Sequence, residues 1–446
     1  MLVTQAYKFA LDPTPRQQRA LWSHCSAARR AYNWGLDLVK QRLDQRTAGM
    51  DVEVPWTLPA LRREWNQAKD QVAPWWRANS NEAYNSGLDA LARGLANWAD
   101  SKRGRRKGPK VGFPNFKAKH RTRPACRFTT GAIRVGTDRH HVTLPRIGRL
   151  RTHESTRKLA RRLEQGTARI LAATISHTGD RWFVSFTVEV QRHVPNNRDD
   201  GDVVGVDVGV RHLAVLSTGR VIPNPRPLDQ AQRRLRRLNR QLARRCGPRA
   251  PDGTRRAPSA HWQHAKRRLA RAHARVANVR RDGLHKLTTK LAGTYEIVVV
   301  EDLNVAGMVR RQCLARAISD AGFGELRRQL SYKCRWYGSD LMVADRWFPS
   351  SKTCSACGAA KAKLPLSIRV FHCDACGTRM DRDLNAAWNL AALVHDVVSG
   401  SGPETGNARG ADRKTRPGGQ VATKREPRTS PALGKTGTAG WQRPTT

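Results

Sequence analysis

The sequence predicts a multidomain protein of mixed α/β and β structure, with a helical segment inserted near its start. In the first half, amphipathic helical stretches precede segments that alternate apolar and polar residues with period two. In the second half, apolar strands alternate with helices, which is typical of a mixed α/β domain with a twisted sheet. With roughly 150 residues per domain, the length corresponds to about three domains.

Residues 1–10 alternate as a strand does, and a long helical stretch follows, with Asp12 or Thr14 as candidate N-cap. A second helix is predicted over residues 81–98 from its apolar stripe. We therefore predict a helical lobe over residues 13–103, inserted after an N-terminal strand.

A small β-barrel or sandwich is predicted next. Residues 102–123 contain ten Lys or Arg and no acid, and their Gly and Pro residues prevent regular structure. Residues 124–195 then alternate with period two around turns, interrupted by one short helix. We assign 1–12 and 104–198 to this domain.

The third region is predicted to be a mixed α/β domain over residues 199–348 and 378–398. Its first strands surround GVDVGV, and a buried strand ends in the acids of IVVVED. Between them, residues 228–291 form a helical pair with 19 Lys or Arg against three acids. A cysteine-rich segment over 349–377 interrupts this domain.

The charge of the chain indicates a polyanionic partner. Lys and Arg number 82 against 36 Asp and Glu, a formal net charge of +46, and such an excess is usually neutralised by nucleic acid. Residues 399–446 contain nine Gly and five Pro, which predicts a disordered basic tail. The absence of long apolar runs and of a secretory leader leads us to expect a soluble intracellular protein without a membrane partner.

Three acids stand where catalytic carboxylates would be expected. Asp207 lies in the apolar strand VVGVDVGV, Glu301 ends the strand IVVVE, and Asp383 lies at the start of the helix DRDLNAAWN. Carboxylates in apolar strands are costly to desolvate, and three together would repel one another. Divalent cations relieve that repulsion and can promote phosphodiester hydrolysis. Hard oxygen donors favour Mg²⁺ or Mn²⁺.

Each acid also has a simpler structural interpretation. Asp207 could be a turn residue, Glu301 a strand-end charge and Asp383 a helix N-cap. Because acids are scarce in this basic chain, their joint placement favours catalysis. Asp302 and Asp381, each within two residues of a member of the set, keep the individual assignments open.

Four of the nine cysteines predict a structural zinc site. They form two knuckles, CSACG and CDACG, spaced C-x2-C-x15-C-x2-C, and are Cys354, Cys357, Cys373 and Cys376. Each knuckle directs two thiolates to one ion, so four sulfurs complete a closed tetrahedral site. The specific spacing disfavours four unligated thiols, and the odd cysteine total argues against a disulfide framework.

The basic residues are candidates for phosphate contact, because ordinary charged surfaces mix both signs. The candidates are Arg103, Arg105, Arg106, Lys107, Lys110, Lys117 and Lys119 in the basic loop, and Arg233, Arg236, Arg237, Arg240 and Arg244 on the first basic helix. On that helix Leu235, Leu238 and Leu242 form an apolar stripe, which leaves the arginines on other faces.

Tryptophan is unusually frequent, with 13 residues. Trp22, Trp34 and Trp98 lie at helical core spacings, which predicts packing. Trp75 and Trp76, beside a proline in a polar stretch, are candidates for stacking on bases.

Taken in order, GVDVGVRHLAVLSTG, VVVEDLN, RWFPSSKTCSACG with FHCDACG, and DRDLNAAWN resemble the split RuvC-like nuclease and zinc ribbon of the TnpB family. These OrfB-type, transposon-encoded proteins are RNA-guided DNA endonucleases related to type V CRISPR effectors. The segment YKFALDPTPRQQRALWSHCSAARRAYNWGL and the loop GFPNFKAKHR are also similar to that family, so the resemblance covers residues 5–396.

The resemblance implies metal-binding acids at Asp207, Glu301 and Asp383, and zinc ligands at the four cysteines. It implies a RuvC-like (RNase H-like) nuclease with an inserted zinc ribbon, and a wedge β-barrel interrupted by a helical recognition lobe. A guide RNA and a target DNA with a short adjacent motif are the implied partners, in a prokaryotic cytoplasm and near the nucleoid. An RNA–DNA duplex is recognised by shape and backbone, which suits a basic surface.

Three functions remain to be compared. An RNA-guided DNA endonuclease is favoured because every motif position is intact. A nuclease-idle RNA-guided DNA-binding repressor would bind target without cutting it. A transposase-type strand-transfer enzyme would join DNA strands without RNA.

Overall fold

The computed structural model describes residues 1–106, 108–119, 121–192, 202–247, 258–310, 312–365 and 367–398. The predicted tail, 399–446, lies outside the described residues. Apart from the last five residues of the final helix, 394–398, the features below belong to one unit, Met1–Leu393. Within the described ranges, no helix combines the length and apolar character needed to cross a bilayer.

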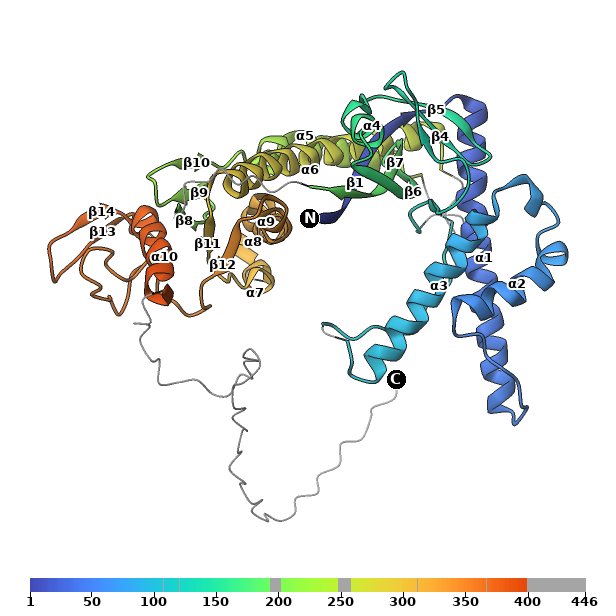
Figure 1. Cartoon of the computed structure of the whole chain (residues 1–446), viewed down its shortest axis with the longest axis horizontal. Helices are drawn as coiled ribbons and strands as arrows, with labels where there is room; N and C mark the ends of the chain where they lie inside the picture. The colour runs from blue at the N-terminus through green and yellow to red at the C-terminus, as the bar shows by residue number, and fades with distance from the viewer. Residues whose placement is uncertain are drawn as a thin grey trace, which may run out of the picture. The chain divides into compact units, whose positions relative to one another are not determined.

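The N-terminal strand is part of a seven-stranded sheet (Figure 1). The strand order is β2-β6-β7-β1-β5-β4-β3, and the pairs are antiparallel. The strands are β1 (Leu2–Asp12), β2 (Ala125–Phe128), β3 (Arg134–Val135), β4 (His141–Leu144), β5 (Gly148–Thr152), β6 (Ala168–Thr178) and β7 (Arg181–Gln191). The predicted short helix is α4 (Arg157–Glu164), between β5 and β6.

Helices are inserted between β1 and β2, as predicted. They are α1 (Pro15–Thr47), α2 (Leu58–Val72), the 3₁₀ turn η1 (Trp76–Ala78) and α3 (Asn81–Lys102). Thr14 caps α1 through a capping box with Gln17. A Cβ added at Gly87 of α3 would lie 2.0 Å from the Ala28 carbonyl oxygen of α1, so glycine permits the two helices to approach closely. One apolar core joins these helices to the seven-stranded sheet.

The second sheet has five strands in the order β10-β9-β8-β11-β12. The strands are β8 (Val203–Asp207), β9 (His212–Leu216), β10 (Val221–Pro223), β11 (Ile297–Val300) and β12 (Asp340–Val343). β8, β11 and β12 are parallel, whereas β9 and β10 are antiparallel to their neighbours. The result is a mixed sheet whose parallel strands end at one edge.

Six helices of the described residues lie between or after the strands of the five-stranded sheet in the chain. They are α5 (Pro227–Arg244), α6 (Ala260–Thr294), α7 (Val305–Arg310), α8 (Gln312–Ala321), α9 (Phe323–Tyr337) and α10 (Arg382–Val398). α5 and α6 lie side by side as the predicted basic pair (Figure 1). Leu235 and Leu238 of α5 pack on Ala272 and Val276 of α6. The cysteine-rich segment contains the small antiparallel pair β13 (Val370–His372) and β14 (Arg379–Asp381).

The tryptophan predictions have mixed outcomes. Trp34 contacts Trp65, and Trp98 stacks on Trp56, with ring centroids 5.1 Å and 6.0 Å apart, so packing is confirmed there. For Trp22 the prediction of core packing is wrong, because the ring lies at the surface against the β6–β7 hairpin and is 43% exposed.

Candidate metal centres and nucleic-acid interface

Sheet register brings two of the predicted acids together. Asp207 is the last residue of β8, and Glu301 directly follows β11. The two strands pair in parallel, with Val206 opposite Val300, so both acids leave the same edge of the sheet.

Helix α10 supplies the third acid, Asp383, in its first turn. The helix lies directly on β8, because a Cβ added at Gly205 would come within 1.9 Å of the Ala387 carbonyl oxygen. Only glycine permits this approach between strand and helix backbones. The first turn of α10 is thereby held beside the carboxyl end of β8.

The three acids interact electrostatically. Asp207 is half-buried, and its pKa is raised well above 3.8, first by burial and then by the charges of Glu301 and Asp383, while Arg382 opposes the rise. Their oxygens are hard donors under mutual repulsion, which fits divalent cations. The carboxylates do not meet as closely as the cysteines do: in the described part of the chain, only the four cysteines form a group of at least three ligand atoms within 4.8 Å of one another.

Neighbouring Asp302 and Asp381 have structural partners. Asp302 forms ion pairs with Arg327 and, at 2.6 Å, with Arg346, and the hydrogen bond from Arg327 is the main cause that lowers its pKa. Asp381 accepts hydrogen bonds from the backbone N–H groups of Asp383 and Leu384, at 2.9 Å and 3.1 Å. Asp381 is therefore the cap of α10, and Asp383 is not.

The sequence reasoning missed Ser350, which is buried and donates a 2.5 Å hydrogen bond to Glu301 Oε1. Asn389 of α10 donates to the carbonyl oxygens of Ser350 and Thr353, each at 2.7 Å. Asn385, one turn earlier, also donates to Thr353 O at 2.7 Å. The available signal was a pair of asparagines four residues apart on an otherwise apolar helix face.

The four cysteines have the geometry of a zinc site. The Sγ atoms of Cys354 and Cys376 lie 3.7 Å apart, and those of Cys357 and Cys373 lie 3.6 Å apart. Tetrahedral zinc with 2.3 Å bonds to sulfur requires about 3.8 Å between sulfurs. Each knuckle turns through a glycine with positive φ, Gly358 at 77° and Gly377 at 73°.

The predicted phosphate-binding residues are mostly exposed. This holds for Arg103, Arg105, Arg106, Lys110 and Lys119 in the basic loop, and for Arg233, Arg236, Arg237, Arg240 and Arg244 on α5. Lys107 lies outside the described residues. Lys117 is half-buried, and its Nζ lies 3.6 Å from the centre of the Tyr32 ring. Phosphate contact by these residues stays a prediction.

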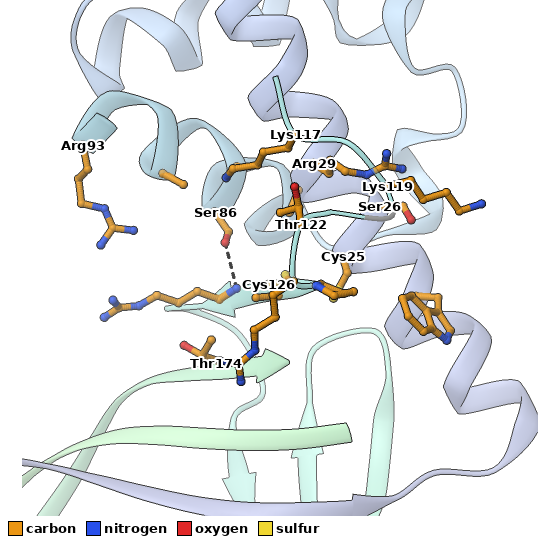
Figure 2. A pocket seen from close by; sticks show the side chains of 18 residues that line it. Cys25, Ser26, Arg29, Ser86, Arg93, Lys117, Lys119, Thr122, Cys126 and Thr174 are labelled. Carbon is orange, nitrogen blue, oxygen red and sulfur yellow. Dashed lines mark hydrogen bonds between the residues drawn. The ribbon is translucent and has the colours of Figure 1, made fainter. Parts of the chain in front are cut away.

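A basic cavity of about 310 Å³ lies between α1, α3, β2 and the segment 117–124 (Figure 2). Figure 2 shows Arg29, Arg93 and Lys117 among the lining residues, contributed by α1, α3 and the segment before β2. Lys119, Arg123 and Arg127 complete the set of cations among its lining residues.

Two of these cations are in unusual surroundings. The buried Nε of Arg127 has no hydrogen-bond partner within the described ranges. Burial, followed by the charge of Arg93, lowers the pKa of Lys117 to about 8. The sequence reasoning named Lys117 and Lys119 here, and Arg123 lies in the basic loop 102–123 that it proposed for phosphate contact. It missed Arg29 and Arg93, because they are contributed by helices that contact each other only in the fold.

The chain thus combines acids at the end of a mixed sheet with an inserted segment of four clustered cysteines. Family models match residues 1–47 ("Helix-turn-helix domain"), 185–312 (OrfB_IS605, "Probable transposase") and 323–390 ("Cas12f1-like, TNB domain"). The chain belongs to the OrfB_IS605 (TnpB) family. Residues 1–47 are one strand followed by one continuous helix, α1.

Three relatives share the name "Putative RNA-guided DNA endonuclease". A Mycobacterium tuberculosis protein is 43% identical, over 93% of this chain and 92% of its own length. A Streptomyces pristinaespiralis protein is 32% identical over 87% and 89%, and InsQ of Escherichia coli is 28% identical over 89% and 93%. The "Cryo-EM structure of the Cas12f1-sgRNA-target DNA complex" has a TM-score of 0.47 at 12% identity, covering 87% of this chain and 99% of that one.

Proposed function

We propose that this chain is an RNA-guided DNA endonuclease that hydrolyses phosphodiesters of a target DNA next to a short adjacent motif. The observation that carries the proposal is the meeting of Asp207 and Glu301 at the ends of paired parallel strands, with Asp383 on the helix packed against β8. The names of relatives that match this chain nearly end to end support it.

The finer fold description is part of this proposal. A central β8 between antiparallel β9 and parallel β11 supports a RuvC-like, RNase H-like nuclease over 199–348 and 378–398, with a zinc ribbon over 349–377. The seven-stranded sheet supports the wedge domain, 1–12 and 104–198, and helices α1 to α3 support a recognition lobe over 13–103.

In the proposed mechanism, the three acids hold metal ions, and neighbouring residues orient the acids. Two bound Mg²⁺ or Mn²⁺ ions would supply water activation and stabilise the leaving oxygen of the phosphodiester. Asp207, Glu301 and Asp383 would hold them, with Glu301 oriented by the Ser350 hydroxyl. Asn385 and Asn389 hold the segment from Ser350 to Thr353 against α10. Cys354 directly follows this segment, so a structural zinc on the four cysteines would also stabilise the loop that carries Ser350.

The proposed partners are a guide RNA and a target DNA. The exposed arginines of α5 and the cations of the basic cavity are the surfaces we assign to their phosphates. Both partners are found in the cytoplasm of a prokaryotic cell, near its nucleoid, which is the location we propose.

The decisive experiment is Asp207→Ala in protein purified with its own RNA, which sequencing would identify. We expect target cleavage to fall by about a thousandfold or more, while target binding persists. Asp340→Ala is the matched control: Asp340 is exposed and starts the parallel strand β12, at the opposite edge of the same sheet. Equal cleavage by Asp207→Ala and the control would overturn the assignment.

Metal removal separates chemistry from binding. Brief EDTA treatment should abolish cleavage, and added Mg²⁺ should restore it, while the zinc content stays unchanged. Target binding without any cut strand in Mg²⁺ would instead favour the repressor. Joined DNA strands without RNA would favour the transposase that the name of the OrfB_IS605 family model describes.

A further inference from the structure

Trp347 is the most exposed large hydrophobic side chain in the described part of the chain. It is 85% exposed, compared with 57% for Trp75. Trp76, the other predicted base-stacking candidate, instead donates its indole N–H to Asp70 Oδ1 at 2.7 Å. An indole left in water contributes nothing to the core, whereas the same flat ring is well suited to stack on a nucleobase.

The backbone that carries Trp347 is held in place. Its N–H donates to Asp345 Oδ1 at 2.8 Å, and the preceding Arg346 forms a 2.6 Å ion pair with Asp302. Three residues later, Ser350 donates to Glu301. Glu301 and Asp302 are consecutive residues after β11, so both attachments of this loop converge on the end of that strand.

These attachments place Trp347 close to the proposed cleavage site. Three residues of extended chain span at most about 11 Å, and three residues separate Trp347 from the serine bound to Glu301. Successive phosphates of one duplex strand are about 3.4 Å apart along the helix axis. The indole is therefore within a few nucleotides of a phosphodiester that reaches Glu301.

The surroundings of Trp347 suit a nucleotide. A shallow hollow of about 500 Å³ includes Trp347 in its lining, together with Asp302, Arg327, Val343, Ala344, Asp345 and Arg346. The side chains of Arg327 and Arg346 are 42% and 47% exposed although both contact Asp302. Guanidinium N–H groups that do not face Asp302 can donate to a phosphate beside the stacked base.

We propose that Trp347 is a positioning residue that stacks on an unpaired base of the DNA strand entering the carboxylate site. This inference rests on the proposed nuclease function. Stacking near the cut would align the phosphodiester with the carboxylates, so it acts on the cleavage step more than on target binding, which guide pairing dominates.

The test uses the full chain with its RNA and targets that carry 2-aminopurine at successive positions around the mapped cut. With the wild type, we expect fluorescence quenching at one or two positions. Trp347→Ala should lose that quenching and cleave about tenfold to a hundredfold more slowly at saturating protein. Trp347→Phe should restore much of both signals, whereas Trp347→Leu should not, because leucine has no ring to stack.

Leu314→Ala is the matched control, since it also removes an exposed large hydrophobic side chain (45% exposed) but lies on α8, to which no nucleic-acid contact is assigned. It should keep the quenching and the cleavage rate. Normal quenching and cleavage by Trp347→Ala would overturn the inference. So would a change in oligomeric state on Trp347→Ala with normal quenching, which would mean that the ring covers a protein interface.

Failure of the nuclease proposal would look different. In that case the wild type itself would not cut, in Mg²⁺ or Mn²⁺. Quenching of a single-stranded 2-aminopurine oligonucleotide by wild type but not by Trp347→Ala would then still support base stacking, and equal quenching by both proteins would refute it.

Discussion

Glu301 and Asp302 are adjacent, yet their contacts give them different roles. Glu301 accepts one hydrogen bond from Ser350, so its carboxylate keeps lone pairs for a cation. Asp302 is engaged by two arginines, which hold the loop of Trp347. Asp381 and Asp383 repeat this division, because Asp381 caps α10 with its carboxylate.

Lys117 supplies a prediction at the same scale. Its pKa of about 8 in the folded protein, caused first by burial, lies below the unfolded value of 10.5. Between these values the unfolded chain binds more protons, so this residue makes stability rise with pH from about 8 to 10.5. We expect Lys117→Met to be more stable than wild type below pH 8, with the difference shrinking at higher pH.

Urea unfolding of wild type and variant from pH 7 to 10 measures this difference. Lys117→Arg is the matched variant, because its guanidinium stays charged and keeps the cost of burial at every pH. Parallel stability curves for wild type and Lys117→Met would contradict the prediction. Since an anion in the basic cavity favours the ammonium, nucleic-acid binding above pH 8 should also take up a proton.

At the scale of elements, the candidate carboxylate site depends on how closely α10 lies on β8. The bare Cα of Gly205 faces the α10 backbone, where an added Cβ would lie 1.9 Å from the Ala387 carbonyl oxygen and 2.7 Å from the Ala391 nitrogen. The strand carries Asp207 and the helix carries Asp383, so the spacing between the backbones sets the distance between two of the three acids.

Gly205→Ala should therefore reduce both stability and cleavage. The added methyl group would overlap the Ala387 carbonyl, and overpacking of this kind costs about 1–3 kcal/mol or more. Gly324→Ala is the control, because nothing lies within 4 Å of its Cβ position in α9. That exchange should raise stability by about 0.5–1 kcal/mol and leave cleavage unchanged.

Thermal unfolding and cleavage rates of the two variants test this contact. A Gly205→Ala protein as active and stable as wild type would show that the strand and helix separate at little cost.

The sequence predicted those parts of the site whose signal is local, and missed those that depend on contacts between residues far apart along the chain. The knuckles and the acids Asp207 and Glu301 stand out because their signal is local: a fixed cysteine spacing, or a charge ending an apolar run. The rivalry between Glu301 and Asp302 could not be decided, since Arg327 and Arg346 lie 25 and 44 residues away from Asp302.

The helical insertion and both groups of strands could also be predicted, from periodicity. The order of the strands could not, since the pairing of β8 with β11 joins segments separated by two long helices. The basic cavity could not be predicted either, because its lining residues come from segments far apart in the sequence.

At the scale of the whole molecule, the charge of +46 predicts steeply salt-dependent binding. The slope of log K against log salt should be about −0.9 for each phosphate neutralised on duplex DNA. Exchanging Arg236 and Arg240 of α5 together for glutamine should reduce its magnitude by about 1.8 if each contacts one duplex phosphate.

Binding of the RNA-loaded protein to duplex target, measured between about 50 and 200 mM salt, gives the slope. Arg139→Gln is the control, because Arg139 is already bound to Glu164, at 2.9 Å between Nη2 and Oε2. An unchanged slope in the α5 double variant would mean that these arginines lie off the path of the nucleic acid.

The position of β1 in the seven-stranded sheet has a consequence for folding during synthesis on the ribosome. β1 pairs with β7 from Leu2 opposite Gln191 to Leu11 opposite Trp182. At about 5–20 residues per second, the ribosome needs roughly ten to forty seconds to make the chain between these partners. The first strand therefore waits, unpaired, while the helices after it are synthesised. A chaperone that shields extended apolar segments would have its earliest opportunity there.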